Sequence, residues 1–295
     1  MLAGRFAIAA VAAALLGASL KLVGRNPFAA KLHIEEVGSD STAFDVVSVL
    51  VAGPTEAILW DAQYHVAEAK QMADKIAASG KHLKAIIISH PDHDHFSGLV
   101  TILQRFPGTP VYMTARGLAV YDTTAERGFK NEKSRRPATL PDSLARPQPL
   151  PTTHFKIDGE DIEIIPDLQG DVITPTNSIM WIPSLNTVLA GDVIFNGVHP
   201  WLGSSDVASR AAWRSTIQRM IALHPTTVVA GHKKDVNAPD SFDAATTMDN
   251  YLKDFDALRA TSSSPEELRN AMLAKYPDMA VRGLLGFGAQ MAFKK

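Results

Sequence analysis

A buried strand that ends in a cluster of metal-binding side chains is the strongest constraint in this sequence. Residues 83–89 read LKAIIIS, a continuous apolar run typical of a strand covered on both faces. Directly after it, residues 90–95 read HPDHDH, which places five imidazole or carboxylate side chains in six positions. In layered α/β folds, the carboxyl ends of strands open the crevice in which ligands bind. The pattern therefore predicts an α/β protein with a metal site at the end of a central strand.

The rest of the chain alternates between predicted strands and helices. Strands are predicted at 31–37, 44–53, 56–62, 109–114, 153–157, 161–166, 178–183, 187–191 and 226–231, and helices at 65–79, 97–106 and 208–224. Two successive halves of strands followed by helices predict two sheets packed face to face with helices on the outside.

Two further segments complete the predicted domain, which runs from residue 31 to residue 295. A polar stretch rich in proline and arginine, from about 126 to 151, predicts an insertion or lid loop rather than a domain linker, because strands resume beyond it. The tail, from about 240 to 290, predicts helices that cover the exposed face of the last sheet.

Composition limits the chemistry of the site. The chain has 29 Lys plus Arg against 31 Asp plus Glu, so it lacks the basic excess of a nucleic-acid-binding protein, and we expect no nucleic-acid partner. It has no cysteine, which excludes disulfides, thiolate ligands and cysteine nucleophiles. Any metal must therefore be held by nitrogen and oxygen, which suits zinc, iron or manganese. Nothing in the sequence indicates the oligomeric state.

Residues 1–30 have the build of a secretory signal. Arg5 precedes an apolar run from Phe6 to Leu20, and small residues follow. An uncleaved anchor is the alternative, but this run falls short of the roughly 20 residues that a spanning helix needs. We therefore expect an exported protein, periplasmic or secreted, with no stable membrane association once the signal is removed.

Three residues far along the chain also follow apolar strands. Asp171 lies in LQGDVITPTNS, Asp192 in AGDVIF and His232 in AGHKK. Each by itself has an ordinary explanation as a turn or capping residue. Because strand ends on one edge of a sheet converge, we expect these residues to meet the 90–95 cluster.

These residues resemble those of the metallo-β-lactamase-fold hydrolases. That family carries HxHxDH after a strand, then a distant histidine, an aspartate in a GD after a strand, and a last histidine in a GH after a strand. Here SHPDHDHFSG, AGDVIF and AGHKK match in order and spacing. Two positions depart from the pattern: Asp92 replaces the second histidine, and Gly170–Asp171 stands where the family usually has GH.

The resemblance implies an αββα sandwich of two mixed sheets with two metal subsites. His90 and Asp92 would face the first metal, and Asp94, His95 and His232 the second. Asp192 would bridge the two subsites. Asp171 would join the first subsite if its side chain reaches the metal, and the alternative that Asp171 is a turn residue stays open. His93 would point away from the metals and orient a neighbour.

The resemblance also implies the cofactors: two divalent metal ions, with zinc preferred. The first subsite has carboxylates where the family has imidazoles, so iron or manganese is an alternative there.

Hydrolysis is the reaction that the resemblance implies, because two metals close together activate a water molecule. We expect a small-molecule substrate with an ester, lactone, lactam or thioester bond. Asp94 would orient the nucleophile, and His199 is the first candidate to assist the leaving group, ahead of Tyr64 and Asn177. Two alternatives stay open, namely a di-iron oxidoreductase of the flavodiiron type and a degenerate metal-binding protein without catalysis.

Overall fold

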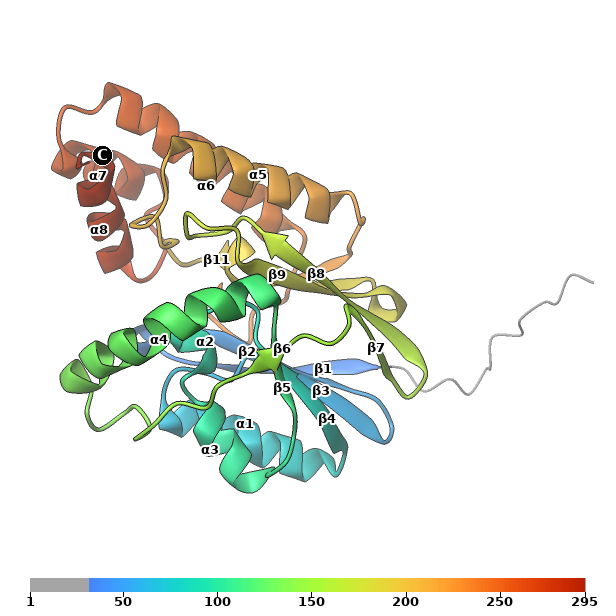
Figure 1. Cartoon of the computed structure of the whole chain (residues 1–295). Coiled ribbons are helices and arrows are strands. Elements are labelled where there is room, and N and C mark those ends of the chain that lie inside the picture. The colour runs from blue at the N-terminus through green and yellow to red at the C-terminus, as the bar shows by residue number, and fades with distance from the viewer. Residues whose placement is uncertain (1–31, 295) are drawn as a thin grey trace, which may run out of the picture.

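Two β-sheets packed face to face form the centre of the fold. The computed structural model describes residues 32–294 (Figure 1). The first sheet contains, in spatial order, β1 (His33–Gly38), β2 (Val47–Ala52), β3 (Glu56–Trp60), β4 (His82–Ile87), β5 (Val111–Met113) and β6 (Gln148–Pro149). The second sheet has the order β12 (Thr227–Val229), β10 (Thr187–Leu189), β9 (Asn177–Ile182), β8 (Glu160–Leu168) and β7 (His154–Ile157). Each sheet combines parallel and antiparallel pairs.

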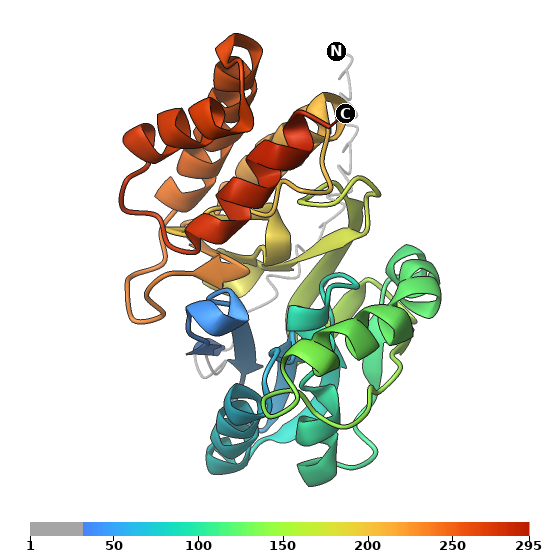
Figure 2. The ribbon, with the colours of Figure 1, turned by 90° about the vertical axis from the view of Figure 1, so that its left-hand side faces the viewer.

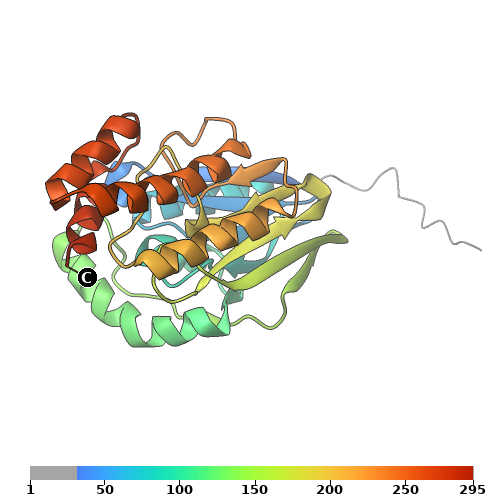
Figure 3. The same cartoon turned by 90° about the horizontal axis from the view of Figure 1, so that it is seen from above.

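Helices cover the outer face of each sheet, so the layers run helix, sheet, sheet, helix (Figures 1 and 3). The first sheet carries α1 (Val66–Ser79), α2 (His93–Phe96), α3 (Leu99–Arg105) and α4 (Ala115–Arg135). The second carries α5 (Val207–Ile221) and α6 (Asp243–Thr261), and α7 (Pro265–Lys275) and α8 (Arg282–Ala292) pack against α6 and each other. The predicted sandwich of two mixed sheets between helices is therefore confirmed.

Strand periodicity explains why the sheets stack in this way. Successive side chains of a strand point to opposite faces. In β2, Val47, Val49 and Val51 pack between the two sheets, whereas Leu50 and Ala52 pack under the helices of the first sheet. Because both faces of this strand are apolar, it is stable only where both are covered. The core therefore forms three layers, one between the sheets and one beneath each set of helices.

The region that the sequence predicts as a lid loop, 126–151, is only partly irregular. Helix α4 continues to Arg135, and its buried positions Leu118, Tyr121, Ala125 and Phe129 follow helical spacing across the supposed start of the loop. Residues 148–149 form β6, which pairs with β5. The prediction of a loop is wrong for these parts, because the polar residues belong to the exposed face of a helix. The irregular segment runs from 136 to 147.

The predicted signal, residues 1–30, lies outside the described residues. Within residues 32–294, no helix has the length and apolar character needed to cross a membrane.

A buried lysine ties the chain after β13 (His232–Lys233) to the first sheet. The Lys233 ammonium lies 3.2 Å from Glu36 Oε2 on β1 and 2.8 Å from Asp240 Oδ1. Burial, together with a hydrogen bond and repulsion from Asp240, raises the pKa of Glu36 to about 7, against an opposing effect of Lys233. In this folded environment, Glu36 binds a proton more tightly than in the unfolded chain.

We predict that the free energy of unfolding depends less on pH in Glu36→Gln than in the wild type. The pKa of Glu36 is about 7 in the folded protein, and its ordinary value is 4.5. The stability that Glu36 gains by binding its proton more tightly in the folded state is therefore fully present below pH 4.5. It is lost as the pH rises through 7. The loss amounts to about 3 kcal/mol for a shift of this size. Urea unfolding at pH 5, 6, 7 and 8 should show a steeper decline for the wild type than for the variant. Glu35→Gln is the control, and equal slopes in all three proteins would refute the prediction.

Candidate metal centre

The candidate site lies where strands of both sheets end on one side of the molecule. Strand β4 leads into His90, β8 into Asp171, β10 into Asp192 and β12 into His232. The second-sheet strands involved share one direction, because β8 and β10 are both antiparallel to β9, and β12 is parallel to β10. Figure 2 faces this side, with α4 in green and the C-terminal helices in red flanking it. Four segments distant in sequence therefore meet at one edge.

Direct hydrogen bonds join the two sheets at this edge. Ser178, at the start of β9, donates from its backbone N–H and its hydroxyl to the carbonyl of Ser89, at 3.0 and 2.6 Å. At Gly231, a Cβ atom would lie 2.6 Å from Asp192 Oδ1. Contacts this short leave no room for a side chain, so a glycine is needed where β12 approaches Asp192.

The 90–95 segment is partly extended and partly helical. Asp92 has extended backbone angles, but α2 already begins at His93, four residues before the predicted start at Ser97. The helical turn carries Asp94 and His95, and the extended part carries His90 and Asp92. Because the backbone changes from extended to helical after Asp92, the two pairs of side chains lie in different parts of the site.

All seven predicted ligands lie together. Potential ligand atoms within 4.8 Å of one another define three overlapping groups, which are His90 with Asp92 and Asp171, Asp94 with His95 and His232, and His90 with His95 and Asp192. Asp171, for which the sequence leaves a turn role open, is buried and belongs to the first group. We name this set of seven residues the metal cluster.

Asp192 occupies the middle of the metal cluster. Its Oδ1 lies 3.0 Å from His95 Nε2, and its Oδ2 lies 3.2 Å from His232 Nε2 and 3.6 Å from His90 Nε2. Burial alone would raise the pKa of Asp192, but the imidazoles of His232, His95 and His90 hold it well below its usual range. Asp192 is therefore an anion shared by three imidazoles.

Each of the three imidazoles is oriented through its other nitrogen. His90 Nδ1 lies 2.8 Å from the Ser89 hydroxyl, and His232 Nδ1 lies 2.8 Å from the carbonyl of Phe44. His95 Nδ1 lies 2.9 Å from Asp61 Oδ2. With Nδ1 engaged, each ring presents Nε2 to the cluster, which is how proteins fix metal-binding histidines.

Asp61 supports the cluster through His95, and the sequence reasoning missed it. It is fully buried at the end of β3, and it also accepts hydrogen bonds from the backbone and hydroxyl of Ser89, both at 2.8 Å. Its φ of 60° is in the left-handed region, which Asp and Asn tolerate better than most residues. A signal was present, because an acid after the apolar run AILW follows the same pattern as Asp192.

The cluster has the properties of a cation site. It gathers four carboxylates, and within residues 32–294 no lysine or arginine forms an ion pair with any of them. Desolvation and the carboxylates of Asp94 and Asp192 raise the pKa of Asp92 to about 7, and burial with Asp192 and Asp92 raises the pKa of Asp171 well above its usual range. His90 Nε2 and Asp171 Oδ2 are buried without a hydrogen-bond partner. Divalent cations would neutralise the carboxylates and satisfy these atoms.

Asp92 and Asp94 are the members of the cluster that solvent reaches. The side chain of Asp92 is 37% exposed and that of Asp94 is 16% exposed, whereas the histidines are buried. His93 joins none of the three groups. Its ring lies 4.9 Å from that of Phe96, and it touches α4 at Gly128, where a Cβ atom would collide with His93 Nε2.

The three candidates for assisting a leaving group occupy different environments. Asn177 lies in the site and donates to Asp171 Oδ1 at 3.2 Å. The Tyr64 hydroxyl donates to Glu132 of α4 at 2.7 Å. His199 is buried, and its Nδ1 lies 2.8 Å from the Tyr251 hydroxyl. It belongs to none of the three groups that form the metal cluster. Burial lowers the pKa of His199 to about 4, so its imidazole is neutral at neutral pH.

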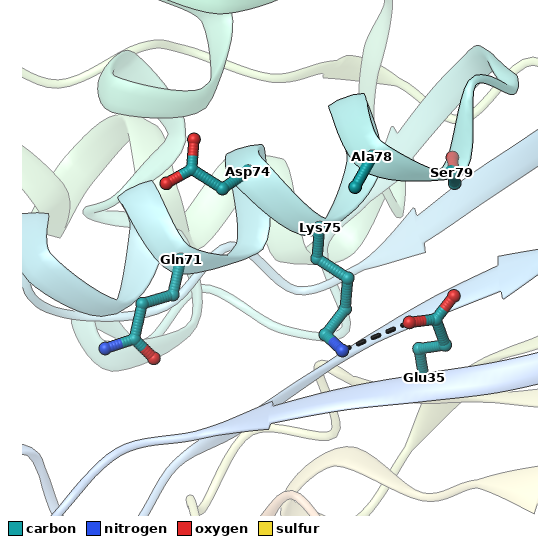
Figure 4. Close-up of a pocket in the computed structure, with 6 residues that line it drawn as sticks. All are labelled: Glu35, Gln71, Asp74, Lys75, Ala78 and Ser79. Atoms are coloured by element: carbon teal, nitrogen blue, oxygen red, sulfur yellow. Dashed lines mark hydrogen bonds and ion pairs between the residues drawn. The ribbon is translucent and has the colours of Figure 1, made fainter.

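A surface groove of about 600 Å³ lies apart from this chemistry, between α1 and β1 (Figure 4). Its lining residues are Glu35, Gln71, Asp74, Lys75, Ala78 and Ser79. An ion pair of 3.1 Å between Lys75 and Glu35 crosses it, and no member of the metal cluster lines it.

Sequence comparison agrees with the fold and the cluster. The family model described as the metallo-beta-lactamase superfamily matches residues 41–232, which span the site from η1 (Ser41–Ala43) to His232. The chain belongs to the metallo-beta-lactamase superfamily. The resemblance seen in the sequence is thereby confirmed. No curated protein matches the chain.

Solved structures of this superfamily share the fold. A metallo-beta-lactamase family protein from Thermus thermophilus is 18% identical, with a TM-score of 0.61 over 86% of this chain and 91% of its own. A metallo-beta-lactamase from Pontibacter korlensis is 16% identical, with a TM-score of 0.55 over 75% of this chain and 94% of its own. At such identities the likeness establishes the fold alone.

We predict that Asp61→Asn weakens metal binding roughly 10- to 100-fold, the usual effect of losing an outer partner of a ligand. The amide keeps the shape and suits the left-handed backbone, but its NH₂ group faces either an N–H donor of Ser89 or the ring of His95. Titration against a competing chelator measures the effect, with Asp74→Asn on the surface of α1 as the control. Wild-type affinity in the folded Asp61→Asn variant would contradict this role.

Proposed function

We propose that this protein is a metal-dependent hydrolase that cleaves a small ester, lactone, lactam or thioester. One observation carries the proposal: seven side chains from four strand ends converge with three Nε2 atoms directed at one shared carboxylate. Holding four carboxylates together, with no lysine or arginine of residues 32–294 paired to them, is costly, and a structural role alone does not require it. Membership of the superfamily supports the same conclusion.

The metal cluster divides into two subsites that share Asp192. His90, Asp92 and Asp171 would hold one divalent ion, and Asp94, His95 and His232 the other. Zinc is the first candidate for the pair, because nitrogen and oxygen ligands of this kind suit it. Two cations bound there would supply a water molecule of lowered pKa and would polarise the bond to be cleaved.

The chain's own contribution is to position groups and protons around this centre. Solvent reaches Asp94, whose Oδ2 lies 3.5 Å from His232 Nε2. A carboxylate there accepts a hydrogen bond from an incoming water molecule and so orients it toward the substrate. Asp192 would hold the three imidazoles in fixed positions around its carboxylate.

The substrate would be a small molecule that enters beside Asp92, the most exposed residue of the cluster. The balanced charge of the chain argues against nucleic acid. The Pontibacter korlensis neighbour is a metallo-beta-lactamase by name, which makes lactams one class to test. We further propose that the protein is exported, on the strength of its N-terminal sequence.

A di-iron oxidoreductase is the second candidate, and the carboxylates of Asp92 and Asp171 in one subsite favour it, because oxygen ligands suit iron. Oxygen consumption by the iron-loaded protein in the presence of a reductant would support this candidate. Hydrolysis of any compound in the panel below, without oxygen uptake, would support the first.

We predict that hydrolysis of one of these bond types depends on metal and on Asp94. Purified protein should carry metal by elemental analysis and lose its activity to a chelator. Asp94→Asn should lower kcat/KM at least about 100-fold, the scale expected for an oriented acid–base group. The panel comprises lactones, lactams, thioesters and simple esters, and Asp142→Asn, an exposed site, is the control. Metal-loaded protein inactive on every class would remove the proposal, and protein without affinity for metal would favour a non-catalytic role.

We predict that His199 acts in stability more than in catalysis. Its contacts with Tyr251 of α6 and with the backbone of Ala280 join the loop after β11 (Phe195–Asn196) to the C-terminal helices. His199→Gln should lower the unfolding free energy by about 1–3 kcal/mol, because it disrupts a buried hydrogen bond. Its kcat/KM per folded molecule should stay within about tenfold of the wild type. A larger kinetic loss at unchanged stability would establish His199 as the group that assists the leaving atom.

A further inference from the structure

A small apolar cluster joins the end of α4 to the chain around η1, apart from the three core layers. It draws on η1, the loop after β3, α4 and the irregular segment 136–147. Its buried members are Ala43, Val46, Tyr64, Phe129 and Leu140, with Phe44 and Leu144 packed against them. The position of the α4 end is therefore tied to that of Phe44.

Arg136, the residue that caps the C-terminus of α4, lies over this cluster. Its guanidinium carbon is 5.5 Å from the centre of the Phe44 ring and 5.5 Å from the centre of the Tyr64 ring. At such distances an aromatic face attracts a cation. Glu132 accepts hydrogen bonds from Arg136 and, at 2.7 Å, from the Tyr64 hydroxyl. The guanidinium is thus held above Phe44 by a second group.

The backbone of Phe44 reaches the metal cluster. Its carbonyl oxygen lies 2.8 Å from His232 Nδ1 and orients that imidazole. Phe44 has a φ of 62° and Asp45 a φ of 59°, so two consecutive residues with side chains lie in the left-handed region. This conformation is costly and persists only where neighbours hold it. The position of the carbonyl therefore depends on the contacts of Phe44.

The chain after Phe44 is held by a different set of contacts. Lys233 donates its N–H to the carbonyl of Asp45 at 2.9 Å, and Val47 donates to the carbonyl of Gly231 at 2.8 Å. These bonds fix residues 45–47 against β13. The Phe44 ring, in contrast, packs on Tyr64, with ring centres 6.0 Å apart, and beneath Arg136.

We propose that Arg136 is a positioning residue for His232, because it holds the Phe44 ring and so fixes the carbonyl that orients this imidazole. The inference rests on the proposed function for the role of His232 as a metal ligand. It adds that the C-terminal end of α4 controls that ligand. Arg136 itself belongs to none of the groups of candidate ligands.

The experiment uses cobalt(II) as the probe, because the visible absorption of this ion depends on the geometry of its ligands. Arg136→Met keeps most of the apolar stem and removes the charge. Metal-free full-length protein is titrated with cobalt against a competing chelator. The affinity should fall about tenfold, the lower end of the effect of losing an outer partner, and the visible bands should shift. Unchanged affinity and bands in the folded variant would overturn the proposal.

Two further variants separate position from charge. Arg136→Lys keeps a cation above the rings and should restore most of the affinity and the spectrum. Arg135→Met removes the neighbouring arginine, whose side chain also faces Glu132 but is 73% exposed, and should match the wild type. Loss of a positive charge alone would favour a bound cation. Equal losses in Arg135→Met and Arg136→Met would therefore refute the specific role of Arg136.

A double-mutant cycle tests the route through Phe44. Phe44→Leu removes the ring and should itself weaken cobalt binding. Arg136→Met should add little in that background, because both changes break one chain of contacts. Losses that simply add would refute the route.

These readouts need no turnover, so the two proposals can fail separately. Cobalt binding that responds to Arg136 and Phe44 as described, without hydrolysis of any tested bond, would refute the hydrolase and keep the positioning role. Hydrolysis, with cobalt binding unaffected by Arg136→Met, would keep the hydrolase and refute the positioning role. Protein that binds no cobalt would overturn both.

Discussion

Asp192 and the three imidazoles around it set the geometry on which the rest of the site depends. A single carboxylate within 3.0–3.6 Å of three Nε2 atoms requires the ends of β4, β10 and β12 to meet within a few ångströms. The sheets must therefore stack at one angle and with one register, and Gly231 and the Ser89–Ser178 hydrogen bonds maintain that approach. The apolar core supplies the free energy for stacking, and the polar contacts at the edge select the arrangement that forms a site.

The cluster also has a cost to stability. Four carboxylates in one small volume repel one another, and the raised pKa values of Asp92 and Asp171 reflect burial first and this repulsion second. A bound cation reverses the sign of this contribution, because it attracts every carboxylate that the others repel. Binding of a metal by the cluster would therefore be linked to folding, and the protein without metal would be the less stable form.

The sequence predicts the fold and the ligands better than it predicts their supports. Strand ends predict that Asp171, Asp192 and His232 meet the 90–95 segment, since periodicity and topology determine where strand ends lie. The choice of ligands among these residues came from the family resemblance, and a turn role for Asp171 stayed open. The role of Asp61 depends on tertiary contacts between distant segments, so local pattern gave it little weight. The loop predicted over 126–151 failed for a different reason. The polar residues there lie on the exposed face of α4, and the prediction did not take into account the helical spacing of the buried residues Tyr121, Ala125 and Phe129.

Gly128 has a consequence for how this protein tolerates change. At this point α4 lies so close to His93 that no side chain fits between them, and His93 stands between two ligands in the chain. Substitutions on the exposed face of α4 should change the stability little, because solvent accommodates almost any residue there. Variation at position 128 is transmitted through one imidazole to the carboxylates on either side. The exposed face of α4 is therefore expected to accept substitutions that position 128, in contact with His93, does not accept.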